Sequence, residues 1–127
     1  MLNKIFVIFL IFFHFTCANV LGNEQISFDV NEIEILDGGN IIVGKNRGII
    51  TTDDGITIEA DQFEFNKVKN ILQAKGNLII KDQINKYNFT AQNVLYSRNE
   101  EKIELIGQAE AVIDTTYKFN SKNIIIL

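Results

Sequence analysis

The chain has 127 residues, a formal net charge of −4, one cysteine, one histidine and neither proline nor tryptophan. Cys17 and His14 both lie in an apolar amino-terminal stretch, so residues 23–127 contain neither residue type. This composition excludes a thiolate nucleophile, a Ser-His-Asp relay, a histidine general base, a Cys/His zinc site and disulfide bridges from that part of the chain. We therefore expect a protein without enzymatic activity that holds no metal ion and no cofactor.

The amino terminus has the pattern of a signal peptide. Lys4 precedes an apolar run over residues 5–15, which is too short to span a bilayer as a helix. Small residues permit cleavage after Gly22 or after Ala18, so we predict a signal peptide over residues 1–22 and an exported domain over residues 23–127. A lipoprotein acylated at Cys17 fits poorly, because the residues just before that cysteine are not small.

Charge is distributed unevenly along the exported part. Residues 23–66 carry ten Asp or Glu against Lys45 and Arg47, whereas residues 67–127 carry nine Lys or Arg against six Asp or Glu. No basic cluster with interleaved aromatic residues is present, which argues against nucleic-acid binding. The asymmetry suits domains that stack head to tail, although solvated faces with chance differences in charge explain it equally well.

A pattern of about 30 residues recurs with anchors at Phe28, Ile58, Phe89 and Phe119. Each unit begins with alternating apolar positions and then shifts by one residue at the same place. The alternating positions before and after the shift are Ile26, Phe28, Val30 then Ile33, Ile35; Ile56, Ile58, Ala60 then Phe63, Phe65; Tyr87, Phe89, Ala91 then Val94, Tyr96; and Tyr117, Phe119, Ser121 then Ile124, Ile126. A one-residue shift turns later side chains to the wrong face, so its recurrence predicts a β-bulge or corner beside the small residue.

A second strand follows a polar turn in each of the first three units. These strands are predicted from Ile42 to Ile50, Leu72 to Ile80 and Ile103 to Ile113, after turns at residues 37–40, 66–70 and 98–101. No segment after residue 22 has a 3.6-residue apolar stripe, so we predict an all-β fold.

The strongest unit carries a family resemblance. Ile58-Glu59-Ala60-Asp61-Gln62-Phe63-Glu64-Phe65 followed by Asn70-Ile71-Leu72-Gln73-Ala74-Lys75-Gly76-Asn77-Leu78-Ile79-Ile80 resembles the repeat of the OstA-like superfamily. That superfamily includes the lipopolysaccharide transport proteins LptA and LptC and the periplasmic domain of LptD. The third unit departs from the pattern at Gln92 and Leu105, and the first has Asn46 where glycine is usual. The resemblance implies an OstA-like β-jellyroll, a folded-over antiparallel sheet of repeated bent strand pairs.

Two features favour the start of LptD over LptA. The repeats begin directly after the signal segment, and a turn over residues 51–55 leads into the strongest unit. Because the sequence stops at Leu127 inside the fourth unit, we expect an amino-terminal fragment, incomplete at its carboxyl end, whose outer-membrane barrel is missing.

The resemblance implies a periplasmic module that shelters the acyl chains of lipopolysaccharide in a β-trough and passes the lipid to the outer membrane. The predicted trough lining is Phe28, Ile33, Ile35, Phe63, Phe65, Leu72, Leu78, Phe89, Val94 and Ile103. The alternative is that these residues simply fill a core, as alternating apolar residues usually do.

Predicted partners are lipopolysaccharide and other OstA-like bridge domains, which would bind by edge-strand addition. The alternative functions are a soluble LptA-type bridge protein and a structural β-solenoid segment of a secreted adhesin. A glycan-processing enzyme acting through Glu32 or Glu100 ranks last, because both carboxylates fall on polar strand faces or turns.

Overall fold

The computed structural model describes residues 26–127, which form an antiparallel eight-stranded sheet. The predicted signal peptide and both cleavage positions lie outside the described residues. The strands are β1 (Ile26–Leu36), β2 (Ile41–Thr52), β3 (Ile56–Ala60), β4 (Gln62–Asn66), β5 (Ile71–Asp82), β6 (Tyr87–Ser97), β7 (Lys102–Ile113) and β8 (Tyr117–Ile126). Single 3₁₀ turns, η1 (Asp37–Gly39) and η2 (Arg98–Glu100), follow β1 and β6. The all-β prediction is confirmed.

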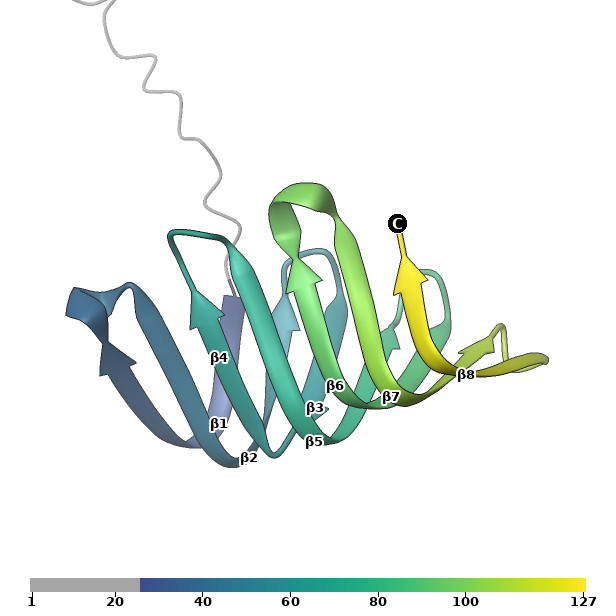
Figure 1. The fold of residues 1–127 in the computed structure, drawn as a ribbon, viewed down its shortest axis with the longest axis horizontal. Coiled ribbons are helices and arrows are strands. Elements are labelled where there is room, and N and C mark those ends of the chain that lie inside the picture. The colour runs from purple at the N-terminus through teal and green to yellow at the C-terminus, as the bar shows by residue number, and fades with distance from the viewer. Residues whose placement is uncertain (1–25) are drawn as a thin grey trace, which may run out of the picture.

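Each long strand bends near its middle, and the short strands β3 and β4 are separated at the same level. The sheet therefore folds over into two walls that meet at a corner (Figure 1). The first wall contains β3, the start of β1, β6 and β8, and the end of β2, β5 and β7. The second wall contains β4 and the remaining halves of the long strands. Opposite the corner, the rims of the walls border an open side that we call the mouth.

The bend explains why the sequence pattern shifts in one strand of each pair but not in the other. At the corner between β5 and β6, Gly76 and Asn77 on β5 face a single residue, Gln92, on β6. One extra residue in a strand turns all later side chains to the opposite face of the sheet, whereas two extra residues leave them on the same face. The phase therefore shifts in β1, β6 and β8 and between β3 and β4, while β2, β5 and β7 keep even spacing. The predicted bulge is confirmed.

Backbone conformation and polar side chains hold the corner. Gly76 has φ of +83°, and a Cβ atom there would lie 2.5 Å from Asp61 Oδ2. The Asp61 carboxylate accepts hydrogen bonds from Asn77 Nδ2 and Arg47 Nη1, each at 2.8 Å. In the first unit, Asn46 adopts φ of 62°, which asparagine tolerates better than most residues, so it replaces the usual glycine.

The core lies between the walls and consists of the inward-facing rows. Its largest fully buried side chains are Ile50, Ile58, Leu72, Leu78, Ile80 and Leu105. Burial of each such side chain contributes about 1.5–3 kcal/mol. The rows cross the whole sheet: Phe28, Ile50, Ile58, Ile80, Phe89, Ala111 and Phe119 occupy successive strands in register. The residues that the alternating sequence pattern places on one face of the sheet therefore pack the interior.

The predicted turns also appear in the structure. The segment after β1 forms η1, the segment after β4 is a turn over residues 67–70, and the segment after β6 forms η2. Asn70 and Glu101 have φ of 54° and 51°, so left-handed residues lead into β5 and β7. Hydrogen bonds join neighbouring turns along the second-wall rim, including Arg98 N to Asn70 O at 3.1 Å and Asn70 Nδ2 to Asn99 Oδ1 at 2.8 Å.

Candidate functional site

A cleft of about 460 Å³ opens at the mouth, toward the β8 end of the fold. Its lining comes from both walls: Asp54, Ile56, Ile80, Asp82, Asn85, Tyr87, Phe89, Tyr96, Arg98, Glu101, Ile103, Ile126 and Leu127. The volume falls within the range of about 300–1,000 Å³ that small-molecule sites occupy. The cleft lies between the two walls, next to the buried side chains of the core.

The floor of the cleft is apolar. Ile80 and Phe89 come from the first wall and Ile103 from the second, and each is less than a tenth exposed. The rings of Phe89 and Tyr87 meet edge to face with centroids 6.1 Å apart. Alkyl groups that enter the cleft therefore meet hydrocarbon and aromatic surface.

Toward β1 two aromatic side chains pack across the interior. Phe28 on the first wall and Phe65 on the second contact one another across the interior, with ring centroids 6.3 Å apart. This ring contact spans the interior near β1, whereas the cleft lies nearer β8.

Polar side chains connect the two walls at the rim of the cleft. Tyr96, near the end of β6, donates a hydrogen bond from its hydroxyl to Asp54 Oδ2 at 3.2 Å. Arg98 in η2 places Nη2 3.3 Å from Asp53 Oδ1, and its side chain is 4% exposed. Burial raises the pKa of Tyr96 to about 12, and the nearby Asp54 carboxylate adds to the rise.

Asp82 belongs to the rim and organises the turn between β5 and β6. Its carboxylate accepts hydrogen bonds from the backbone of Ile84 and from both the backbone and the side chain of Asn85, at 2.7–3.0 Å. Burial by itself raises the pKa of Asp82, but these hydrogen bonds outweigh it and lower the pKa overall. Asp82 therefore contributes to stability above its unfolded-state pKa, and the contribution is lost as pH falls through the folded pKa.

All ten residues predicted to line a trough face the interior according to the strand register. They are Phe28, Ile33, Ile35, Phe63, Phe65, Leu72, Leu78, Phe89, Val94 and Ile103. Seven are buried and Phe28 is half-buried, whereas Ile33 and Ile35 are 50% and 67% exposed. The two isoleucines lie on the edge strand β1, where no further strand covers them.

Only Phe89 and Ile103 of those ten also line the cleft. The other buried residues pack against one another, so a lipid-contacting role for the full set stays a prediction. The cleft residues Ile80, Tyr87, Tyr96 and Ile126 belong to the alternating apolar pattern, so repeat phase was the signal that identified their face. No local sequence pattern identified Arg98 as a cleft residue, because it lies in a polar turn.

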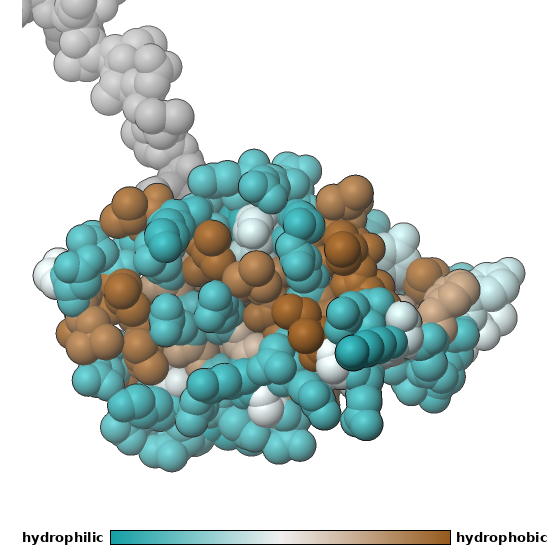
Figure 2. All heavy atoms as spheres, viewed as in Figure 1, coloured by the Kyte–Doolittle hydropathy of each residue, from teal (hydrophilic) through white to brown (hydrophobic). Residues whose placement is uncertain are grey.

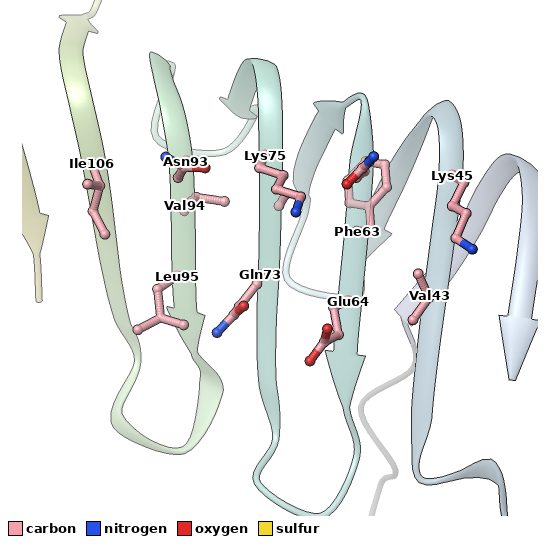
Figure 3. Close-up of a pocket in the computed structure, with 12 residues that line it drawn as sticks. Val43, Lys45, Phe63, Glu64, Gln73, Lys75, Asn93, Val94, Leu95 and Ile106 are labelled. Carbon is pink, nitrogen blue, oxygen red and sulfur yellow. The ribbon is translucent and has the colours of Figure 1, made fainter. Parts of the chain in front are cut away.

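A second hollow, of about 360 Å³, lies on the outer face of the second wall (Figure 3). Its labelled side chains alternate in chemistry: Val43, Leu95 and Ile106 lie among Lys45, Glu64, Gln73 and Lys75. Hydrophobic patches are interspersed with hydrophilic side chains across the corresponding view of the whole molecule (Figure 2). Charged and apolar side chains are thus mixed along this outer hollow, which lies on the face of the second wall that points away from the core.

Two further findings concern residues 26–127. Within them, no three His, Cys, Asp or Glu residues are grouped in a way that would hold a metal ion. No helix in the same range has the length and apolar character needed to cross a membrane.

The sequence matches no protein-family model and no curated protein. Its structure is similar to that of LptH from Pseudomonas aeruginosa, the LptA-homologous periplasmic component of the conserved lipopolysaccharide transport device, with a TM-score of 0.72. The fold is an LptA-like β-jellyroll. The match covers 80% of this chain and 75% of LptH, at 14% sequence identity. Structural similarity at such a low sequence identity shows the fold alone, and it confirms the predicted fold class.

Proposed function

We propose that this chain is a periplasmic module of a lipopolysaccharide transport bridge and acts by binding acyl chains, without catalysing a reaction. The observation that carries the proposal is the cleft with an apolar floor between the two walls of an LptA-like fold. Its floor offers hydrocarbon contact, while Asp54, Asp82 and Arg98 keep the rim polar. Each methylene removed from water contributes about 0.8 kcal/mol, so a short stretch of one acyl chain supplies useful affinity.

Site-specific photo-crosslinking tests this proposal. A photoreactive residue at position 89 or 103 is expected to capture lipopolysaccharide, because both side chains line the cleft. Thr90 is the matched control, since it neighbours Phe89 on β6 but faces outward. Capture at position 90 without capture at positions 89 and 103 would contradict binding inside the folded sheet. A structural segment of an adhesin would give no capture at any of the three positions.

We further propose that copies or related domains join edge to edge, β8 of one to β1 of the next. β1 contains Asp29, Glu32 and Glu34 and no basic residue, whereas β8 contains Lys118 and Lys122 and no acidic residue. Both edges expose inward-facing apolar side chains, including Ile35 at 67% and Phe119 at 54%. A second domain at either edge would extend the inner rows and cover them.

The strand directions define the geometry of this junction. β1 and β8 run the same way, because an odd number of strand positions separates the two edges of an antiparallel sheet. Simple translation therefore pairs them in parallel and continues the row in which Ile35 and Ile126 lie at opposite edges.

Cysteines at positions 35 and 126, in a Cys17→Ser background, should form intermolecular disulfides and a ladder of oligomers. Cysteines at positions 34 and 126 are the control, because Glu34 faces outward. Equal ladders from both pairs, or a strictly monomeric protein across a wide concentration range in sedimentation, would contradict ordered stacking.

The finer assignment within the transport bridge is also a proposal. The onset of the repeats favours the periplasmic domain of LptD, tethered to the outer membrane through its barrel, whereas the similarity to LptH favours a soluble LptA-type component. The gene sequence beyond residue 127 separates the two. Long alternating strands of barrel type would support LptD, and a short ending after further repeats would support an LptA-type protein.

A further inference from the structure

The mouth of the folded sheet is bridged beside the cleft by contacts between residues far apart in sequence. Asp53 and Asp54 lie in the turn between β2 and β3, on the rim of the first wall. Tyr96 and Arg98 lie at the end of β6 and in η2, on the rim of the second wall. The bridge therefore spans the two rims, rather than neighbouring strands of one wall.

Each side of the bridge is fixed to its own wall. On the first wall, the hydroxyl of buried Thr52 donates a hydrogen bond to Asp54 Oδ1, which leaves Oδ2 for Tyr96. On the second wall, the backbone of Arg98 is tied to Asn70 at 3.1 Å. Because each pair of bridging residues is fixed to its own wall, moving the walls apart breaks the contacts of Tyr96 and Arg98 with Asp54 and Asp53.

The bridging residues also form part of the cleft. Asp54, Tyr96 and Arg98 line it together with Ile80, Phe89 and Ile103. Toward β1 the rings of Phe28 and Phe65 pack against one another across the interior. The bridge thus lies along the cleft itself, where movement of the rims would change access to it.

We propose that the four residues Asp53, Asp54, Tyr96 and Arg98 form a latch across the mouth, and that its opening governs how an acyl chain enters the cleft. This proposal rests on the proposed function. With the latch closed, the rims stay together beside the cleft and a chain enters only through the part of the mouth nearer β8. With it open, the walls separate at the mouth and a chain enters from the side.

The strength of the latch suits a reversible device. One hydrogen bond typically changes an equilibrium constant by about fivefold, and a partly exposed ion pair changes it less. The side chain of Asp53 is 45% exposed, so water reaches one side of the ion pair. The closed state is therefore favoured by a modest factor that a bound lipid is able to reverse.

Wall separation is measured with spin labels on cysteines at positions 68 and 84, in a Cys17→Ser background. Val68 and Ile84 lie in turns on opposite rims and are 74% and 72% exposed. Asp53→Asn combined with Asp54→Asn is expected to lengthen and broaden the distance distribution. Tyr96→Phe keeps the ring packing, removes only the hydroxyl contact and is expected to give a smaller change in the same direction.

Entry of a fluorescent fatty acid, a dansylated undecanoic acid, is measured on the same variants. The paired Asp53→Asn and Asp54→Asn changes should accelerate association roughly fivefold. Glu104→Gln is the matched control, because the ion pair of Glu104 with Lys102, at 2.5 Å, lies within the single strand β7. It should alter neither wall distance nor association rate.

The outcomes separate the two proposals. Binding of the probe with unchanged distances and rates in the Asp53→Asn, Asp54→Asn and Tyr96→Phe variants overturns the latch and leaves lipid binding in place. Absence of probe binding to the unmodified protein, confirmed with lipopolysaccharide, overturns the proposed function. Thermal unfolding of each variant identifies any that fail to fold, and Tyr96→Phe then decides the result.

Discussion

The corner and the mouth of the folded sheet are stabilised in different ways. At the corner, strands turn through left-handed residues such as Gly76, and the Asp61 carboxylate is held by Arg47 and Asn77 of neighbouring strands. At the mouth, the two rims meet through a few side chains, Asp53 and Asp54 against Tyr96 and Arg98. Covalent continuity and backbone geometry hold the corner, whereas side-chain contacts between the rims hold the mouth in the described part of the chain. In the proposed latch mechanism, such a sheet opens at the mouth without losing its strand pairing.

The largest effect is expected from a methyl group at the corner. Gly76→Ala places Cβ 2.5 Å from Asp61 Oδ2 at φ of +83°, which strains the backbone and displaces the Asp61 carboxylate from its partners. We expect a loss of about 3 kcal/mol in the free energy of unfolding, measured by denaturant titration. Gly38→Ala has a similar φ of +60° with no atom within 4 Å, so it should cost only about 1 kcal/mol. Equal losses would show that close packing at the corner is unimportant.

A smaller effect is expected at the mouth. Tyr96→Phe removes the hydroxyl contact with Asp54 and leaves the buried ring, so the free energy of unfolding should fall by about 1 kcal/mol. The same denaturant titration measures it. A loss as large as that of Gly76→Ala would contradict the view that the mouth is the weaker closure.

The pH dependence of Tyr96 gives the finest test of the closed mouth. Because its pKa rises from the usual 10.0 to about 12 in the folded protein, the neutral hydroxyl stabilises the fold below pH 10. That contribution should decline as pH rises from about 10 through about 12. Absorbance of tyrosinate should show one component titrating near pH 12 that disappears in Tyr96→Phe. A Tyr96 that titrates near pH 10 would indicate that the mouth is open in solution.

The sequence was sufficient to predict the two faces of the sheet, because phase shifts at Val30, Ala60, Ala91 and Ser121 mark where each strand bends. It was not sufficient to predict how far the interior is filled. Alternation assigns a side chain to a face, but the spacing between the walls depends on contacts such as that of Phe28 with Phe65.

The latch was also beyond local sequence patterns. Asp54 and Tyr96 are 42 residues apart, and both Asp53 and Arg98 lie in turns where charged residues are usually solvated. The exposure of Ile33 and Ile35 has a different cause. Their inward orientation follows from the pattern, but their 50% and 67% exposure follows from a place on an edge strand without a neighbour.

The central claim is that acyl chains lie inside the folded sheet, and a single tryptophan tests it most directly. The chain contains no tryptophan, so Phe89→Trp provides a lone fluorophore on the cleft floor and Thr90→Trp provides one on the outer face of the same strand. Lipopolysaccharide or a fatty acid with brominated acyl chains should quench emission at position 89 and leave position 90 unchanged. Quenching at position 90 alone, or at neither position when the lipid is bound, would contradict binding between the walls.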